Sequence, residues 1–259
     1  MNTSSESSST RLSSVASAIR ILKAFSETEV ELGISLLSQR LGLAKSTVHR
    51  LVSTLAAEGL LEQNEATGKY RLGLELFAMG ALVRRQMNIG TLSLPYLHQL
   101  RSSTSETVHL AALDQRHIIY LYNLESDHAI RERSYIGARK PAYCSSEGRA
   151  MLAHLERSQL MEHLPNPLAP RTPNTCTHLP TLLKQLDQIA QQGYAEDDEE
   201  TELGVRSLAA PIYNVDSRVI AAVGIAGPVQ RLTKKTLKTY VPYVIETAQA
   251  ISQRLGHTP

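Results

Sequence analysis

Apolar side chains recur at helical spacing in three short segments near the start of the chain. The repeating positions are Val48, Leu51, Val52 and Leu55 in one segment, Ile34, Leu37 and Leu41 in the segment before it, and Val15, Ile19, Leu22 and Phe25 in the first. Spacings of three and four residues predict three amphipathic helices that share a small core. Gly42 separates the last two segments and supplies the backbone freedom that ends a helix in a left-handed conformation.

The polar face of the third predicted helix carries no acidic side chain, because no Asp or Glu occurs in residues 32–57. Its candidate DNA-binding residues are Lys45, Ser46, Thr47, His49 and Arg50. A short helix, a turn and a second helix with such a face are typical of a helix-turn-helix. Lys45 is expected at a phosphate, while Ser46, His49 and Arg50 are placed to reach base edges in a major groove.

A hairpin is expected after this helix. Residues 60–61 begin an extended run, residues 64–68 are rich in turn formers, and residues 70–72 extend back. Such a wing makes Lys69 and Arg71 available for contacts with the DNA backbone. The alternative is an ordinary three-helix bundle with a solvated, charged face.

The length of 259 residues favours two domains. We expect a disordered, Ser/Thr-rich tail over residues 1–10, a winged helix-turn-helix over 11–73, a linker helix over 74–88 and a mixed α/β domain over 89–259. The predicted fold class is therefore α+β.

The second domain shows both helical and extended patterns. Strands are predicted over 108–113, 117–123, 129–135, 205–212 and 219–226, and helices over 93–102, 145–154, 158–163, 179–192 and the C-terminal segment. The C-terminal helix carries a seam suited either to packing across the sheet or to pairing two subunits. The acidic run 197–200 is interpreted as a solvated turn, with a divalent-cation site as the alternative.

Composition indicates the class and compartment of the protein but does not decide its function. The net charge of +2 neither requires nor excludes nucleic acid, and 42% hydrophobic residues suffice for ordinary cores. No apolar run is long enough to span a membrane, and the two cysteines are too few for a disulfide framework. We therefore expect a cytoplasmic protein. No cofactor is predicted, although Cys176 and His178 leave a zinc site as a minor alternative.

Three blocks of sequence resemble the IclR family of bacterial transcriptional regulators. They are GLAKSTVHRLVSTLAAEGLLEQ with the wing through KYRLG, GARKPAYCSSEGRAMLA at 137–153, and QGYAEDDEETELGVRSLAAPIYNVDSRVIAAVGIAGP at 192–228. The resemblance implies a GAF-like effector-binding domain after the winged helix-turn-helix. It also implies a homodimer or dimer of dimers on double-stranded operator DNA, controlled by a small organic or aromatic acid.

The resemblance also implies where such an effector would bind. The implied residues are Glu132, Cys144, Ser145, Ser146, Glu147, Asp197, Val205, Ser207, Gly224 and Ala226. A helix that starts near Ser146 would attract a carboxylate through its N-terminal N–H groups. Glu147 stands where the family often has a small residue, and an inward Glu147 would repel an acid. Gly224 and Ala226 lack the hydroxyls that small-acid binders can carry, which favours a larger or partly aromatic effector.

The function expected from these observations is ligand-responsive regulation of a catabolic operon. One recognition helix reads only a few base pairs, so the operator is expected to be palindromic. Two alternatives belong to other classes. One is an enzyme that acts on a small acid through Cys144 and Asp197, and the other is a DNA-binding protein without an effector.

Overall fold

The computed structural model describes residues 13–258, and the side chain of Asn88 is not described. The tail expected over residues 1–10 lies outside this range. The chain divides into two compact units, one ending at Met87 and the other beginning at Asn88. The fold class predicted from the sequence is confirmed, because an N-terminal helix-turn-helix unit precedes an α/β domain with an antiparallel sheet.

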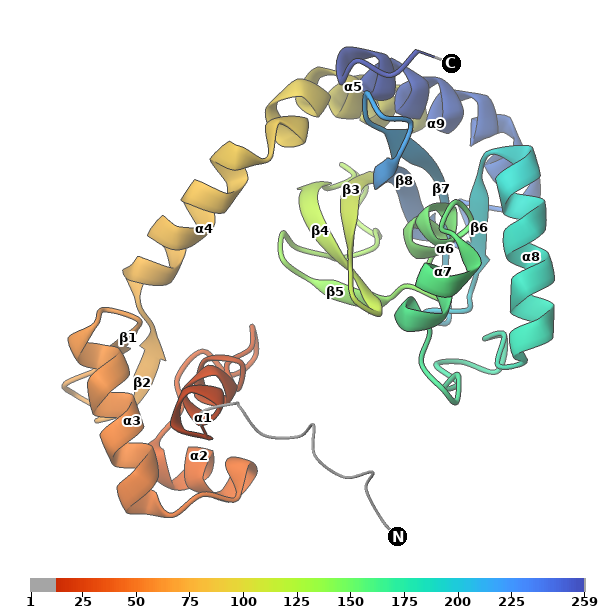
Figure 1. Ribbon diagram of the computed structural model, residues 1–259. Coiled ribbons are helices and arrows are strands. Elements are labelled where there is room, and N and C mark those ends of the chain that lie inside the picture. The colour runs from red at the N-terminus through yellow and green to blue at the C-terminus, as the bar shows by residue number, and fades with distance from the viewer. Residues whose placement is uncertain (1–12, 259) are drawn as a thin grey trace, which may run out of the picture. The chain divides into compact units, whose positions relative to one another are not determined.

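The first unit is a winged helix-turn-helix followed by one long helix (Figure 1). Its elements are α1 (Ser13–Leu22), α2 (Ile34–Leu41), α3 (Lys45–Ala57), β1 (Leu61–Gln63), β2 (Tyr70–Leu72) and α4 (Leu74–Gln86). Gly42 ends α2 at φ 65° and ψ 34°, as the sequence predicted. The predicted stripe of α3 is confirmed, since Val48, Val52 and Leu55 are buried in the core of this unit.

The apolar stripe predicted for α1 is wrong at its first two positions, although Leu22 and Phe25 pack against the core. Val15 and Ile19 are 53% and 46% exposed, and Ile21 is the buried residue of the helix. The helix also ends before Phe25, which packs at the edge of the core from the following segment. An early helix end changes which face the remaining residues present, so the spacing to Phe25 was not a helical repeat.

The second unit is built on a six-stranded antiparallel sheet in the order β5-β4-β3-β8-β7-β6. Its strands are β3 (Thr107–Asp114), β4 (His117–Leu124), β5 (Arg139–Pro141), β6 (Ala195–Asp198), β7 (Val205–Tyr213) and β8 (Val219–Pro228). Its helices are α5 (Asn88–Thr104), α6 (Ser146–Leu152), α7 (Arg157–His163), α8 (Leu179–Gln192) and α9 (Lys234–Arg254).

Helices cover both faces of this sheet (Figure 1). On one face α6 and α8 pack on small side chains of the central strands, including Ala111, Ala209 and Ala222. On the other face α5 and α9 lie together against β3, β7 and β8. The C-terminal seam therefore packs across the sheet, through residues such as Leu237 and Val244.

The strand predicted over 129–135 is wrong, because this segment joins no sheet ladder. The edge of β4 pairs instead with β5, through His117–Ile119. Side chains hold the segment 129–135: Thr107 donates to the carbonyl of Glu132 at 3.4 Å, and Asn123 donates to that of Ser134 at 2.5 Å. Side chains over 131–135 nevertheless alternate between more buried and more exposed positions. The sequence pattern therefore indicated which side chains are buried, and not that the segment pairs with a strand.

The solvated turn predicted over 197–200 is also wrong for half of its length. Ala195–Asp198 forms the edge strand β6, and Asp197 is only 4% exposed. The turn begins at Glu199, whose φ is 60°. The four consecutive acids suggested a solvated turn, but Asp197 is bound by backbone N–H groups and Asp198 pairs with Arg206.

Candidate functional site

The exposed face of α3 is the first candidate site. Each proposed DNA-binding side chain of this helix is exposed, namely Lys45, Ser46, Thr47, His49 and Arg50. Lys69 and Arg71 are exposed on the wing. Arg71 is paired with Glu62 on the neighbouring strand at 2.9 Å, so a phosphate would have to compete with that carboxylate.

The wing is held by contacts that the sequence did not reveal. Glu31 accepts a hydrogen bond from Asn64 at 2.8 Å and another from Thr67 at 3.3 Å. Leu32 and Tyr70 exchange backbone hydrogen bonds, which adds a bridge to the two-stranded sheet. These contacts fix the hairpin that carries Lys69 relative to the helices of its own unit.

The second candidate site is a buried polar cluster beneath α6. Ser145 caps this helix by accepting a hydrogen bond from the backbone N–H of Gly148 at 3.3 Å. The next residue, Ser146, reaches the sheet, where its hydroxyl lies 2.7 Å from that of Ser207. The predicted helix start and the predicted strand are thus brought together through two buried hydroxyls.

The side chain of Glu147 points into the protein, the orientation in which the sequence analysis expected it to repel an acid. Its side chain is 2% exposed, and Oε1 lies 3.3 Å from Nδ1 of His109 on β3. Ser146 donates to the other carboxylate oxygen at 3.1 Å. The expected repulsion of an acid is therefore reduced, because the carboxylate is already paired with an imidazole.

His109 is the centre of the cluster and is completely buried. Its Nε2 lies 2.6 Å from the Ser134 hydroxyl and 3.2 Å from Oε2 of Glu132. Its ring stacks on that of Tyr120, with 4.3 Å between the centroids. Both ring nitrogens thus face acceptors, an arrangement that suits a doubly protonated ring.

Lys140 completes the charge balance by donating to Oε1 of Glu132 at 3.0 Å. Burial opposes the charge of His109, but the carboxylates of Glu132 and Glu147 outweigh it and raise its pKa to about 9. Burial would raise the pKa of Glu132, but His109 and Lys140 lower it to about 2. The same competition lowers the pKa of Glu147 and raises that of Lys140. Two carboxylates and two cations therefore form an internally neutral group.

Asp197 is also buried near the start of α6. Its Oδ1 accepts hydrogen bonds from the backbone N–H groups of Glu200, at 2.7 Å, and Thr201, at 3.3 Å. Burial raises its pKa in spite of these bonds. The hydroxyl of Thr201 donates to the carbonyl of Cys144 at 3.1 Å. Thr201 therefore links the carboxylate of Asp197 to the residues just before α6.

Salt bridges anchor the remaining acids of this run. Arg149 on α6 pairs with Glu200 at 2.6 Å, and Arg206 on β7 pairs with Asp198 at 2.6 Å. The first pair is largely buried, whereas Asp198 is 39% exposed in its side chain. The acidic run is thus tied to α6 and β7. In the described part of the chain no group of three or more His, Cys, Asp or Glu could hold a metal ion.

Cys144 is a packed thiol. It is fully buried, and burial raises its pKa to about 11, so the thiol is protonated at neutral pH. Its sulfur lies 3.8 Å from the carbonyl of Pro141 and 4.0 Å from the hydroxyl of Thr201. This environment does not activate a nucleophile.

The expectation that Gly224 leaves room in the site is wrong. A Cβ there would lie 2.7 Å from the carbonyl oxygen of Leu208 and 3.3 Å from Oε1 of Glu147. Glu147 and the backbone of β7 already occupy that space. Ala226 on β8 is buried and pairs with Ser207 on β7, while Val205 lies at the end of the same ladder, opposite Pro228. Gly224 pairs with His109 on its other side. Among the predicted effector-binding residues of β7 and β8, Val205 is therefore the one farthest from His109 along the strands.

Sequence reasoning missed both cations of the cluster, His109 and Lys140. It also missed the neighbouring residues Tyr120, Ser134, Arg149 and Thr201. One signal was available, because His109 interrupts an apolar run on β3 at a position whose neighbours are buried. A buried ionisable residue needs a partner, and that requirement points to acids elsewhere in the chain.

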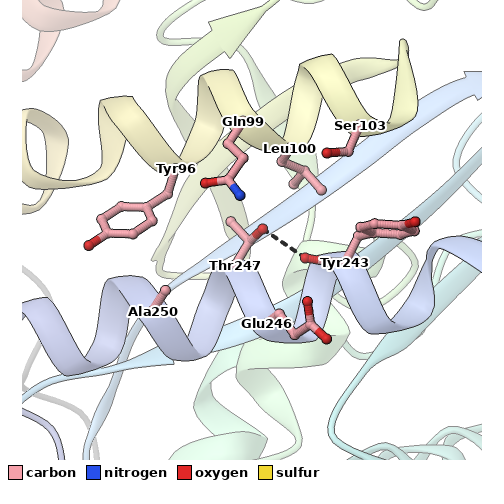
Figure 2. A pocket seen from close by; sticks show the side chains of 8 residues that line it. All are labelled: Tyr96, Gln99, Leu100, Ser103, Tyr243, Glu246, Thr247 and Ala250. Atoms are coloured by element: carbon pink, nitrogen blue, oxygen red, sulfur yellow. Dashed lines mark hydrogen bonds between the residues drawn. The ribbon is translucent and has the colours of Figure 1, made fainter.

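A separate groove lies between α5 and α9, on the opposite side of the sheet from α6 (Figure 2). Its volume is about 180 Å³, and its lining includes Tyr96, Gln99 and Tyr243. It shares no lining residue with the polar cluster. In Figure 2 Thr247 donates to the carbonyl of Tyr243, at 2.7 Å, which satisfies one of its polar groups within α9.

Comparisons with known proteins cover both units of the chain. The family model for the bacterial transcriptional regulator IclR C-terminal domain matches residues 81–253, and the model for the IclR helix-turn-helix domain matches residues 14–65. These matches define a bacterial transcriptional regulator with a DNA-binding N-terminal domain. The chain belongs to the IclR family.

Individual relatives match over nearly the whole chain. The HTH-type transcriptional regulator KdgR of Escherichia coli is 36% identical over 247 residues, covering 95% of this chain and 94% of the relative. A putative IclR regulator from Silicibacter has a TM-score of 0.81 at 29% identity, covering 95% of this chain and 97% of that structure. An IclR homologue from Microbacterium hydrocarbonoxydans, complexed with 4-hydroxybenzoate, has a TM-score of 0.79 at 29% identity over 94% of this chain and 99% of its own.

These relatives are transcriptional regulators, and the protein is not an enzyme. The alternative in which Cys144 and Asp197 carry out catalysis is thereby removed, in agreement with the protonated thiol. Within residues 13–258 no helix is both long and apolar enough to cross a membrane.

Proposed function

We propose that this protein regulates a catabolic operon and that a small organic or aromatic acid changes its affinity for the operator. The observation that carries this proposal is the neutral, buried polar cluster beneath α6, formed by Glu132, Glu147, His109 and Lys140. Buried charges are costly, so a protein retains them mainly where they perform a task. The solved relative with 4-hydroxybenzoate supports an acid as the ligand.

Three features make the region around α6 suitable for an acid. The hydroxyls of Ser146 and Ser207, which bond to Glu147 and to each other, can turn to donate to a ligand carboxylate in exchange for those bonds. We infer from the resemblance that the ligand lies beside Cys144, Ser145 and these two hydroxyls, in reach of Asp197. The pairing of Glu147 with His109 removes the net negative charge that would otherwise repel an anion.

The DNA half of the proposal rests on the exposed face of α3. Ser46, Thr47, His49 and Arg50 are the proposed base-reading side chains, and Lys45, Lys69 and Arg71 contact phosphates. One such helix covers only a few base pairs. Useful affinity then needs two copies related by a twofold axis, and hence a palindromic operator with half-sites about one helical turn or a multiple apart.

The proposed homodimer has a candidate interface on α4. Within the described residues no side chain of this helix is buried, although several are large and apolar: Leu74, Phe77, Met79, Leu82 and Val83. A row of exposed apolar side chains on one helix is typical of an interaction surface. A dimer of dimers would need a second surface, on the effector-binding unit.

One combined experiment tests the proposal. Purified protein is screened by thermal shift against organic and aromatic acids, and acids that raise the melting temperature are added to a complex with operator DNA selected from a random pool. We expect at least one acid to stabilise the protein and to change the DNA affinity measured by fluorescence anisotropy. An acid that stabilises the protein but leaves DNA affinity unchanged would argue against a regulatory role for the site.

A further inference from the structure

The polar cluster has a pronounced asymmetry in its hydrogen bonding. Oε1 of Glu132 accepts a hydrogen bond from Lys140, but Oε2 accepts none from the residues described, although the side chain is 2% exposed. Oε2 points toward the centre of the cluster, 3.2 Å from Nε2 of His109. That nitrogen makes its hydrogen bond with the Ser134 hydroxyl, at 2.6 Å. A buried carboxylate oxygen without a donor is costly, and it is an acceptor for a donor supplied from outside.

The charges of the cluster decide what kind of donor fits. The ring of His109 faces Glu147 on one side and Ser134 on the other, so it donates from both nitrogens and carries a positive charge. Lys140 supplies a second positive charge. Because two cations already neutralise the two carboxylates, a ligand ammonium would be buried beside like charges without compensation. A neutral hydroxyl gives the hydrogen bond without adding charge.

We propose that Glu132 is a specificity-determining residue that receives a hydroxyl group of the effector, so that the effector is a hydroxylated carboxylic acid and not a plain one. This inference rests on the proposed function, because it assumes that an acid binds beneath α6. Glu147 lies on the far side of His109 and keeps the imidazole charged and fixed in place. Glu147 is therefore a positioning residue, and Glu132 is the acceptor.

The location of Glu132 gives the ligand a way in. Glu132 and Ser134 lie on the irregular segment 129–135, which is held outside the sheet and whose backbone carbonyls accept three side-chain hydrogen bonds, from Thr107, Asn123 and Arg231. Neighbouring Ile130, Tyr135 and Ile136 are exposed, so displacing this segment breaks few apolar contacts. Segments with few buried contacts open at low cost. Lys140, 21% exposed in its side chain, is the charged group of the cluster nearest to solvent.

Matched sets of acids test this assignment on the full-length protein. One set is benzoate, 4-hydroxybenzoate and para-aminomethylbenzoate, and the other is hexanoate, gluconate and ε-aminocaproate. Each set compares a plain acid, a hydroxylated acid and an acid with an ammonium group. Titration calorimetry should show that the hydroxylated member of at least one set binds at least tenfold more tightly than both others, because the unsatisfied carboxylate penalises ligands without a neutral donor. This comparison needs no variant and so does not depend on whether a mutant folds.

The variant Glu132→Gln keeps the side-chain volume and removes the charge. We expect its preference for the hydroxylated acid over the plain acid to fall to within about threefold, because a neutral amide accepts a weaker hydrogen bond. The control Glu125→Gln alters a partly exposed carboxylate that pairs with Arg131 at 2.7 Å, and it should keep the parent preference. A change of preference in both variants would show a general charge effect and would overturn the assignment.

The outcomes separate the two levels of the proposal. If plain and hydroxylated acids bind equally well and both change DNA affinity, the acid-sensing function stands and the assignment of Glu132 is overturned. If an ammonium-bearing acid binds most tightly, the charge argument is overturned. If no acid in either set and no acid in the wider screen binds, the proposed function fails, and the assignment of Glu132 fails with it.

Discussion

Glu147 fills the space above Gly224: a Cβ at residue 224 would lie 3.3 Å from Oε1 of that carboxylate. The same Cβ would lie 2.7 Å from the carbonyl oxygen of Leu208 on the neighbouring strand. The glycine on β8 and the glutamate on α6 are therefore complementary in size. The small residue at 224 makes room for the Glu147–His109 pair and not for a larger ligand.

This complementarity predicts the effect of adding one methyl group. Gly224→Ala should destabilise the protein by about 1–3 kcal/mol, because the new Cβ meets backbone that cannot move aside. The control Gly80→Ala adds the same methyl group to α4, where no atom lies within 4 Å. It should be neutral or stabilising by up to about 1 kcal/mol, since Ala is the better helix former. Urea unfolding of the full chain measures both, and equal stability of the two variants would contradict the steric argument.

The sequence allowed local structure to be predicted better than the site. The stripe of α3 and the glycine that ends α2 are local signals, and both were confirmed. The site depends on contacts between distant residues: His109 and Glu147 are 38 positions apart, and neither position alone indicates the other. The irregular segment 129–135 resembled a strand because its alternation reflects burial. The hydrophobic pattern of a segment indicates which of its faces is buried, but not which other element packs against that face.

The raised pKa of His109 predicts a pH dependence of stability. Its pKa rises from 6.5 to about 9 on folding, so the stabilisation is fully present below pH 6.5 and is lost as pH rises through about 9. The order of magnitude is about 3 kcal/mol for this completely buried group. Urea unfolding at pH values from 6 to 10 should show this loss.

The variant His109→Gln tests the cause of that pH dependence. It should be less stable at pH 6.5 by roughly 3–5 kcal/mol, because two buried carboxylates lose their shared cation. It should also lose most of the decline between pH 6.5 and 9. Adding Glu147→Gln should restore part of the stability by removing one unpaired charge. A decline of unchanged size in the single variant would assign the pH effect to other groups.

The two cysteines should differ sharply in reactivity. Cys144 is buried with its pKa raised to about 11, whereas Cys176 is partly exposed. Iodoacetamide at pH 7.5 should therefore label the native protein at Cys176 and reach Cys144 only after unfolding, because the thiolate is the reactive form. Mass spectrometry of the two peptides measures this. Rapid native labelling of Cys144 would show that the start of α6 opens more readily than its packing indicates.

The exposed stripe of α4 predicts where the dimer forms. Phe77 is 77% exposed on this helix, and Phe77→Ser should weaken self-association at least tenfold if the ring is buried in the proposed interface. The control Val30→Ser changes an apolar residue that is 60% exposed elsewhere in the same unit, and its association should match that of the parent. Sedimentation velocity over a concentration series measures the monomer–dimer balance. If the Phe77→Ser variant dimerises like the parent, the dimer interface does not include this face of α4.

The two sets of DNA contacts should differ in what they contribute. Arg50 lies on the exposed face of α3, where a lost base contact costs roughly 1–3 kcal/mol and relaxes the preference at one position of the operator. Lys45 lies at the start of the helix, where a lost phosphate contact weakens binding to all sequences and flattens the salt dependence. Arg50→Ala and Lys45→Ala are compared by fluorescence anisotropy on the selected operator, on single-base variants of it and on unrelated DNA. Lys238→Ala, which removes an exposed charge from α9, controls for net charge and should leave both affinity and specificity near those of the parent. Arg50→Ala binding with unchanged base preference would remove Arg50 from sequence reading, even if its affinity fell.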